Sequence, residues 1–557
     1  MHGAILVRAA LAAGLIALPV AAQTTRESGP VSQAVREDAL DPSPVDPARD
    51  PDISRFLNDW RTSPPRTAFG KLVFRDILTR LDSDDPVRPV KRGAVLTAIT
   101  AVSHATLAPE ASAAGRAKPG ERQIFYTVAG TGRLSVNGKA HVIKEGVGFT
   151  LAPGFDFILS NSGKRPLAFY VRTEPLPAGA KPEVEVAVVS RWDLDRRVGA
   201  HWTHICNGGP GGMSLCTIAP YTMPQPHSHP GEEVWLLVKG ESVLSLGKNL
   251  VRMHPGQAYK IPPTGLTAHS NLNLGDEPIQ LLYMGPAVRG PGPGPSTDFA
   301  RLDNSPIAAA AAPDVDMFIG RWRDAYPRIA HGNLYLRDML TTLQGADELH
   351  PTRKGAVLVN ADAVSYAMLE PGSTAHRLDS DPKGVQETFV VTSGTGTITA
   401  GGKGFALGRG MSFIVTPDLD FRLTATGDRY LTFYVVTEKG TGSAPKAFAV
   451  VDHRASPSVV RDWFESERPV ITKTDGLIRF SAISHIALKP MAIARPTSTA
   501  AGAEEIWIAL DDVDVLIGRQ LRHVLAGTAL KVPATGITAH ANINLANKPA
   551  EFLTIVR

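Results

Sequence analysis

The stretch Pro226-His227-Ser228-His229-Pro230-Gly231-Glu232-Glu233-Val234-Trp235 decides how this 557-residue sequence is interpreted. His227 and His229 are two residues apart, so on a strand both imidazoles point to the same face. Glu233 opens the next apolar run, and the turn at Pro230-Gly231 lets its carboxylate face the two histidines. Another Gly/Pro-rich turn precedes His269, which can come from a facing strand.

These four side chains, His227, His229, Glu233 and His269, form a candidate metal site. Three imidazoles and one carboxylate leave two positions open on an octahedral ion, and this ligand set suits Fe(II), Mn(II), Co(II) or Ni(II). Zinc also fits if one ligand detaches. Glu233 is then a ligand and, when detached, a candidate catalytic base. The alternative, surface-turn histidines in a sugar-binding or storage barrel, stays open.

The same residues resemble the cupin superfamily, whose first motif is His-x-His, three or four residues, Glu and a closing Gly. Its second motif contains Gly, Pro, Gly, His and Asn, and here it is one or two residues longer before the histidine. The matching residues are His227, His229, Glu233, Gly240, Gly256, Pro262, Gly265, His269 and Asn273. The resemblance implies a six-stranded double-stranded β-helix, and it extends over residues 93–290 and 355–557.

The chain is a duplication of two halves. Residues 56–61 (FLNDWR) recur as 318–323 (FIGRWR), and residues 92–96 (RGAVL) recur as 354–358 (KGAVL), with a constant offset of 262 residues. Residues 261–269 also recur, as residues 532–540. The Gly/Pro and alanine runs between the halves are typical of a linker.

A weaker repeat divides each half again, so the sequence predicts four barrel units in two pairs. The fold class we expect is all-β with short helical entry segments, in which four cupin barrels form two bicupin halves. Apolar spacing of three to four residues around Phe56, Trp60, Leu72, Ile77 and Leu78 favours helix in the first entry segment. The predicted segments are 1–22 signal peptide, 23–50 tether, 51–92 entry segment, 93–180 unit one, 181–290 unit two, 291–312 linker, 313–354 entry segment, 355–440 unit three and 441–557 unit four.

The other three units lack the full ligand set. Unit one has Arg116, Lys118, Gln123 and Phe157 at the ligand positions, and two cations with a phenyl ring cannot hold a divalent ion. Unit three keeps Glu387, but Phe421 replaces the second-motif histidine and His376 is out of register. Unit four keeps Glu505 and His540, with Thr497 and Thr499 in place of the His-x-His pair. Two ligands make a weak site, and the alternative for His540 is a barrel-wall imidazole hydrogen-bonded to Glu505.

The N-terminus is typical of a secretory signal. Arg8 supplies positive charge, residues 9–20 are apolar, and Val20-Ala21-Ala22 offers small residues for cleavage. We therefore expect a periplasmic or secreted protein. In an oxidising compartment, Cys206 and Cys216, which flank a Gly-rich turn, can form a disulfide, and two buried free thiols are the alternative.

Composition excludes several functions. The net charge of +4 is spread along the chain, which gives no electrostatic case for nucleic acid or a membrane as a partner. Two cysteines exclude a disulfide framework or a zinc-finger array. Four barrels in one chain can satisfy cupin-type dimer interfaces internally, so we expect a monomer or a homodimer.

We therefore predict an exported metalloprotein with one divalent ion in unit two. The leading hypothesis is an oxygenase (a dioxygenase or oxidase) or a lyase that acts on a small organic acid, phenolic or sugar-derived molecule. The alternative is a non-catalytic periplasmic binding or structural protein, since fold alone does not choose between them.

Overall fold

The computed structural model describes residues 51–557, with gaps at 177–178, 180–184, 193–195, 199–203, 208–211, 225–230, 265–266, 268, 286–312, 441–447, 463–464 and 537. Side chains are also left undescribed at residues 196–198, 204–207 and 462. The predicted signal peptide, tether and linker, and the ligands His227 and His229, lie outside the described residues. In the described part, the helices are 3-10 turns of three or four residues: η1 (Ile53–Phe56), η2 (Trp60–Thr62), η4 (Val315–Phe318), η5 (His453–Ala455) and η6 (Lys473–Asp475).

Unit one consists of two facing sheets around a phenylalanine core. Phe125 stacks on Phe149 at 4.7 Å between ring centres, and Phe169 meets both edge-on. The larger sheet runs β13 (Val188–Ser190), β10 (Val147–Leu151), β7 (Glu121–Ala129), β12 (Leu167–Pro175), β5 (Ala101–Leu107), β3 (Leu72–Arg80) and β2 (Pro65–Ala68), with β4 (Ala94–Leu96) beside β3. The smaller runs β6 (Ser112–Arg116), β11 (Asp156–Asn161), β8 (Thr131–Val136) and β9 (Lys139–Lys144).

Unit three repeats this plan with the same stacked core, in which Phe389 and Phe413 lie 5.0 Å apart. Its larger sheet runs β24 (Pro327–Ala330), β25 (Leu334–Thr342), β27 (Ala363–Leu369), β34 (Leu431–Lys439), β29 (Val385–Ser393), β32 (Met411–Val415) and β35 (Val450–Asp452), with β26 (Ala356–Leu358) beside β25. The smaller runs β28 (Thr374–His376), β33 (Phe421–Ala425), β30 (Gly396–Ala400) and β31 (Lys403–Leu407).

Units two and four each have a seven-stranded sheet. In unit two it runs β1 (Leu57–Asp59), β20 (Gln257–Lys260), β17 (Val234–Lys239), β22 (Ile279–Met284), β16 (Met213–Ile218), β15 (His204–Asn207) and β14 (Arg196–Val198). In unit four it runs β23 (Ile319–Arg321), β44 (Thr528–Lys531), β41 (Glu505–Ala509), β46 (Ala550–Val556), β38 (Ala482–Leu488), β37 (Glu465–Thr472) and β36 (Val459–Asp462).

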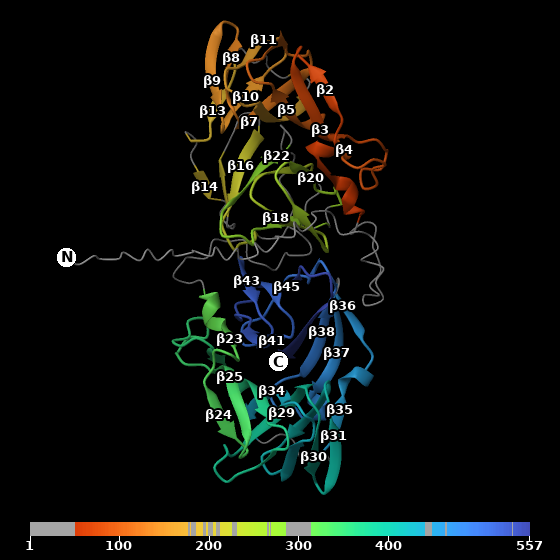
Figure 1. The fold of residues 1–557 in the computed structure, drawn as a ribbon, viewed down its shortest axis with the longest axis vertical. Coiled ribbons are helices and arrows are strands. Elements are labelled where there is room, and N and C mark those ends of the chain that lie inside the picture. Colours follow the sequence, from red (N-terminus) through yellow and green to blue (C-terminus); the bar gives the residue numbers. More distant parts are fainter. Residues whose placement is uncertain are drawn as a thin grey trace, which may run out of the picture.

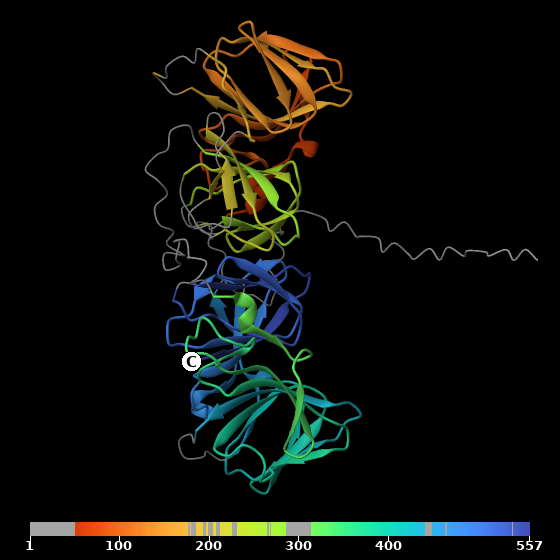
Figure 2. The same cartoon turned by 90° about the vertical axis from the view of Figure 1, so that its left-hand side faces the viewer.

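The facing sheets of units two and four are one continuous sheet that joins the halves. Its order is β21 (His269–Leu272), β18 (Ser242–Leu246), β19 (Asn249–Met253), β39 (Ala492–Ile493), β45 (Ala539–Asn544), β42 (Val513–Ile517) and β43 (Gln520–Val524), with β40 (Thr497–Ser498) beside β45. The contact is reciprocal, because Asn249 pairs with Ala492 while Gln520 pairs with Thr222. As a result, the lobes lie in the order one, two, four, three (Figures 1 and 2).

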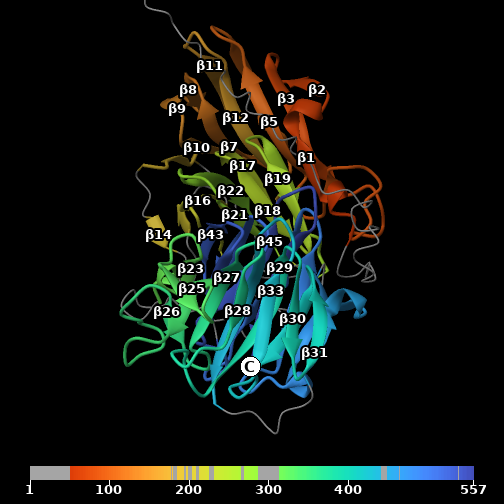
Figure 3. The ribbon, with the colours of Figure 1, turned by 60° about the horizontal axis from the view of Figure 1, so that its bottom comes forward.

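An apolar cluster lies beneath this shared sheet. It contains Met223, Val243, Leu250 and Leu272 from unit two, together with Leu516, Leu521 and Ile543 from unit four. Figure 3 shows β18, β21 and β45 close together at the centre of the molecule. Burial of apolar side chains from both halves stabilises this contact.

The entry segments are the main correction to the predicted fold. Each begins with a short 3-10 helix, but residues 72–80 form strand β3 instead of the helix that the spacing favoured. The register of β3 against β5 shifts between Asp76 and Leu78. This bulge turns Leu72 toward the core of unit one and Ile77 and Leu78 toward the contact with unit two. At a bulge, a strand loses its strict alternation of apolar and polar residues. The apolar residues of this strand therefore have a spacing of three to four, which is typical of a helix.

The entry segments also tie the two units of each half together. β1 adds to the sheet of unit two while β2 and β3 add to unit one, and β23 to β25 repeat this arrangement in the second half. Strands β13 and β35 likewise lie within the ranges predicted for units two and four but pair with β10 and β32 of units one and three. The sheets therefore cross the boundaries expected from the sequence.

In each half, a buried ion pair connects the two units; we call each of these contacts a joint. The Glu232 carboxylate accepts hydrogen bonds from the backbone N–H of Thr97, Ala98 and Ile99, and Lys260 Nζ lies 3.5 Å from it. In the second half Glu504 accepts from the N–H groups of residues 359 and 360, with Lys531 Nζ at 3.2 Å. Each lysine also donates to a backbone carbonyl at 2.7 Å.

Cys216 is disulfide-bonded. The chain has one other cysteine, Cys206, which stands directly opposite Cys216 in the β15–β16 pair. The predicted disulfide is therefore confirmed. Among the described residues, no helix combines the length and the apolar character that crossing a bilayer requires.

Candidate metal centre in unit two

Two of the four predicted ligands come together inside unit two. Glu233 directly precedes β17, and His269 begins β21 in the sheet that faces it. Both side chains are buried, and Glu233 Oε1 lies 3.3 Å from His269 Nε2. The other two, His227 and His229, lie in the undescribed segment 225–230.

Aromatic side chains around this pair hold the carboxylate in place. The Trp235 indole N–H donates to Glu233 Oε1 at 2.5 Å. Asn271 Nδ2 donates to the Tyr259 hydroxyl at 2.6 Å, and Ser242 Oγ donates to Asn271 Oδ1 at 3.4 Å. Burial raises the pKa of Tyr259 well above its usual value, so the phenol stays neutral. The fold thus places Trp235 and Tyr259 beside the pair formed by Glu233 and His269.

The described donors fit a divalent ion. Neighbouring ligands on an octahedral ion with bonds of about 2.1 Å are roughly 3.0 Å apart. The 3.3 Å between Glu233 Oε1 and His269 Nε2 is close to that separation. Among the described residues no group of three or more histidine, cysteine or acidic side chains is arranged to hold a metal. In the predicted ligand set, the remaining donors are His227 and His229, outside the described residues.

Unit four keeps this arrangement without the histidine pair. Trp507 Nε1 donates to Glu505 Oε1 at 2.7 Å, as Trp235 does to Glu233, and the Thr499 hydroxyl donates to Glu505 Oε2 at 2.7 Å. The His540 ring lies 5.2 Å from the Trp507 ring. Glu505 thus receives its hydrogen bonds from Thr499 and Trp507, and the alternative of an imidazole bonded to Glu505 is wrong. Burial lowers the pKa of His540 to about 4, against the opposing charge of Glu505.

Unit three contains a buried group that the sequence analysis missed. His331, at the tip of the β24–β25 hairpin, lies between two carboxylates: Nδ1 is 2.9 Å from Asp381 Oδ2, and Nε2 is 2.8 Å from Glu387 Oε2. Burial alone would lower the pKa of His331, but the bonds and charges of Glu387 and Asp381 raise it. The ring meets Phe421 edge-on at 5.3 Å. His376, by contrast, is exposed, in agreement with its being out of register.

Unit one fills the same space with apolar groups. Phe69 occupies the hairpin position of His331, with φ of 49° against 51°, and packs edge-on against Phe157 at 4.9 Å. Gln123 replaces Glu387 and lies 3.4 Å from the Thr173 hydroxyl. Arg116 and Lys118 bind carboxylates at the surface. The offset of 262 residues between Phe69 and His331 was the signal in the sequence that could have located the histidine.

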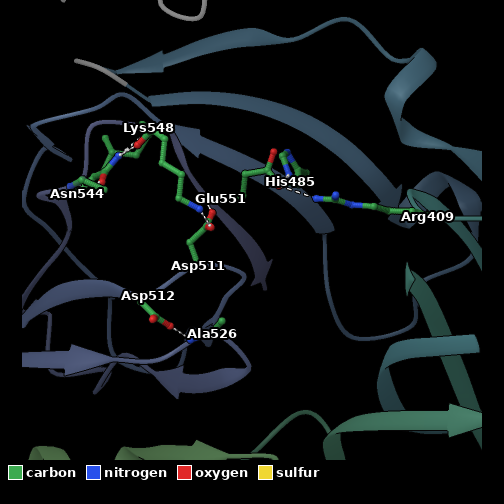
Figure 4. A network of polar contacts seen from close by, with 10 residues as sticks. Arg409, His485, Asp511, Asp512, Ala526, Asn544, Lys548 and Glu551 are labelled. Atoms are coloured by element: carbon green, nitrogen blue, oxygen red, sulfur yellow. Dashed lines mark hydrogen bonds and ion pairs between the residues drawn. The ribbon is translucent and has the colours of Figure 1, made fainter. Parts of the chain in front are cut away.

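A pocket of about 700 Å³ opens where units two and four meet. Its polar lining includes Arg252, Asp511, Asp512, Asp514, His523 and Lys548. Figure 4 shows the hydrogen bond between Lys548 and Asp511. Nearby, Glu551 of unit four lies between His485 and Arg409, and its ion pair with Arg409 connects unit four to unit three. All of these acidic groups have partners, and none of the predicted ligands lines this pocket.

The family comparison agrees with this geometry. The model of the cupin domain matches residues 214–285 and 365–437, within units two and three. Both matched segments are similar to the cupin domain. The match at 214–285 includes the whole predicted ligand set, and the match at 365–437 includes Glu387 and Phe421.

Solved structures similar to this chain share little sequence with it. They include AerE from Microcystis aeruginosa (13% identity, 41% of this chain and 98% of that chain, TM-score 0.32). A variant of oxalate decarboxylase from Bacillus subtilis matches at 12% identity over 46% of this chain and 84% of its own, with a TM-score of 0.33. The Ylba protein from E. coli matches at 14% identity over 44% and 95%, with a TM-score of 0.32. No curated protein matches the chain.

Proposed function

We propose that this protein is a metal-dependent enzyme whose active site lies in unit two. His227, His229, Glu233 and His269 would hold one divalent ion, which is Fe, Mn, Co, Ni or Zn. The observation that carries the proposal is the approach of Glu233 Oε1 to His269 Nε2 from two facing sheets inside a buried barrel. The proposed substrates are small organic acids, phenolics or sugar-derived molecules.

The proposed reaction class is that of an oxygenase or a lyase. The bound ion supplies either redox chemistry or Lewis acidity at its open positions. The chain's own residues orient the site: Trp235 restrains the Glu233 carboxylate, and Glu233 is the group that would take up a proton from the substrate. Tyr259 and Asn271 form a rigid, neutral wall beside it.

Metal content per chain tests this proposal. Elemental mass spectrometry of the native protein is expected to find about one first-row transition metal, lost in a His227→Ala/His229→Ala variant and in His269→Ala. The matched control is His540→Ala in unit four, which should leave the metal content unchanged. Absence of metal in the native protein, with no uptake of added Mn, Fe, Co, Ni or Zn, would instead support a non-catalytic binding or structural protein.

We also propose that the protein is exported to the periplasm or secreted. The N-terminal sequence pattern supports this, and so does the disulfide of Cys216, since disulfides persist in oxidising compartments. N-terminal sequencing of the mature protein from cells of its source is expected to begin at Gln23. A mature protein that begins at the first residue would contradict export through a cleaved signal.

Finally, we propose that the chain is a monomer in solution. The reciprocal contact of units two and four buries, within one chain, the edge strands that separate bicupins would use to pair. Light scattering should give the mass of one chain. A stable dimer or larger assembly would count against this interpretation.

A further inference from the structure

Residues 450–456, which we call the crossing segment, carry the chain from unit three to unit four. Strand β35 adds to the sheet of unit three, η5 follows it, and the next strands, β36 and β37, belong to unit four. The His453 ring of η5 stacks on the His485 ring of β38, with 5.4 Å between ring centres and 21° between planes. A pair of imidazoles therefore forms the contact of this segment with unit four.

Arg191 is the residue of the first half that corresponds to His453. Its N–H donates to the carbonyl of Gly146 at 2.9 Å, and the His453 N–H donates to the carbonyl of Gly410 at 3.2 Å, in both cases just after an edge strand, β13 or β35. Arg191 Nη1 donates to Gln280 Oε1 of unit two at 3.2 Å. The first half therefore makes this contact through a guanidinium, whose charge does not change with pH in proteins.

The partners on the other side of the contact differ as well. By strand register, His485 of unit four occupies the position of Leu215 in unit two. Glu551 occupies the position of Gln280 in the same way. The second half thus has groups that titrate where the first half has an apolar side chain and a neutral amide.

His453 is buried among positive charges. Its side chain is 7% exposed, and among the described residues no hydrogen bond reaches its Nδ1. Arg468 lies directly opposite His485 in the β37–β38 pair. Burial is the main cause that lowers the pKa of His453 to about 4. The charges of His485, Arg454 and Arg468 act in the same direction, and that of Asp452 opposes them.

The carboxylates around the stacked rings already have partners. Asp452 accepts hydrogen bonds from the Arg454 guanidinium at 2.8 and 2.9 Å. Glu551 lies 3.6 Å from His485 Nε2 and 3.1 Å from Arg409 Nη2 (Figure 4). Strand β32, which pairs with β35, consists of uncharged residues. Protonation of the buried imidazole on η5 would therefore add a charge that no free carboxylate of these elements balances, and this costs free energy.

We propose that the contact between the crossing segment and unit four is acid-sensitive: it stays closed while His453 is neutral and opens when His453 is protonated. The corresponding contact of the first half, made by Arg191 and Gln280, stays closed over the same pH range. This device is independent of the metal centre proposed for unit two.

The direction of the effect follows from the burial of His453. Because its pKa is about 4 in the closed contact and near the ordinary 6.5 once the ring is in water, the open form binds the proton more tightly. The contact is therefore fully stable above pH 6.5 and weakens as the pH falls toward 4. Within that window, the equilibrium constant for opening should rise by up to about tenfold for each pH unit.

Hydrogen exchange of the full chain, followed by mass spectrometry from pH 7 to pH 4.5, tests the proposal. After correction for the pH dependence of the chemical exchange rate, peptides of residues 450–456 should lose protection by up to about tenfold per pH unit below pH 6.5. The peptide of residues 188–192, which contains Arg191, should keep its protection and serves as the control within the same chain.

Two variants of one residue separate the effect of charge from that of packing. His453→Gln keeps a neutral group, so it should remove the acid response of the crossing segment. His453→Arg carries a permanent charge, so it should expose the segment at pH 7 as acid does in the native chain. If both variants raise the exchange equally at pH 7, packing and not charge holds the segment, and the proposal is wrong.

His104→Tyr is the matched control for a buried histidine elsewhere. Burial also lowers the pKa of His104 to about 4, and Tyr366 stands in its place in the second half. This variant should leave the exchange of residues 450–456 unchanged at every pH. The proposal is overturned if residues 188–192 respond to acid as residues 450–456 do, if His453→Gln keeps the native response, or if His104→Tyr removes it.

Discussion

Units two and four bring the same three types of side chain together, and they differ in what surrounds those side chains. Trp235 and Trp507 each donate to a carboxylate, Glu233 or Glu505, at 2.5 and 2.7 Å. A histidine from the facing sheet completes both groups. The indole contact is therefore common to both barrels, whereas the metal proposed for unit two depends on His227 and His229, whose place in unit four is taken by Thr497 and Thr499.

Units one and three teach the complementary lesson. In both, a hairpin of the entry segment places one side chain at its tip into the barrel, with nearly the same positive φ. Phe69 meets the Phe157 ring, and His331 meets two carboxylates. One backbone position thus closes a barrel either by apolar packing or by charge.

Rebuilding the histidine pair in unit four tests the first comparison most strongly. Thr497→His together with Thr499→His supplies the two missing ligands beside Glu505 and His540. We expect the metal content to rise from about one to about two ions per chain, measured by elemental mass spectrometry. The same two changes combined with His540→Ala should return it to about one. A content that stays at one would show that more than the loop separates the two units.

Removing His331 tests the second comparison. His331→Ala removes the imidazole that lies between the buried carboxylates of Asp381 and Glu387, and we expect it to lower the free energy of unfolding of unit three by about 3–5 kcal/mol, measured by urea denaturation. The double variant His331→Phe/Glu387→Gln, which copies unit one, should recover most of that loss. If His331→Ala and the double variant are equally destabilised, the ion pairs of His331 do not stabilise this hairpin.

A second test of the role of His331 is the pH dependence of stability in the native protein and in His331→Phe/Glu387→Gln. Because the folded pKa of His331 is raised above its ordinary value of 6.5, its stabilising contribution is fully present below that pH and is lost as the pH rises through the folded pKa. The stability difference between the native protein and His331→Phe/Glu387→Gln should therefore shrink as the pH rises. The measurement is the urea midpoint of each protein from pH 6 upward, and a difference that grows with pH would contradict it.

A smaller loss of stability is expected when the buried ion pairs that connect the two units of each half are removed. Glu232→Gln leaves the buried Lys260 without its counter-charge, and we expect it to cost about 3 kcal/mol of unfolding free energy. Glu504→Gln should cost less, because Lys531 keeps Glu348 Oε2 at 3.9 Å. Only Glu232→Gln should also reduce the metal content, because Glu232 precedes the ligand Glu233. If both variants keep the metal content of the native protein, the ion pair of Glu232 does not influence the metal site.

The disulfide lies only in the first half, and its removal should give the smallest of these changes in stability. Reduction of the bond between Cys206 and Cys216, or Cys216→Ser, should lower stability by about 2–3 kcal/mol for so short a loop. In unit four the equivalent strand position is Ile486, buried in the core. Thermal melting with and without reductant should therefore shift only the transition of the first half.

Much of the architecture was predictable from local patterns. The motif around His227, the offset of 262 residues and the inner repeat predicted all-β barrels in four units, and the Gly-rich turn between the cysteines allowed a disulfide without deciding it against two free thiols. The interpretation of residues 72–80 as helix was wrong, because a bulge interrupts the alternation that identifies a strand. His331 was missed because it comes from a hairpin outside the motif region that it completes.

The sequence by itself determined the type of domain, the duplication and the unit with a full ligand set, since these depend on residue types at fixed spacings. Only the tertiary structure decided how the units share strands, that units two and four form one sheet, and that His331 meets Glu387 inside unit three. Each of those features depends on which side chains from distant strands meet in space. A barrel brings together residues more than a hundred positions apart, as with Lys531 and Val357, so their contacts leave no local trace in the sequence.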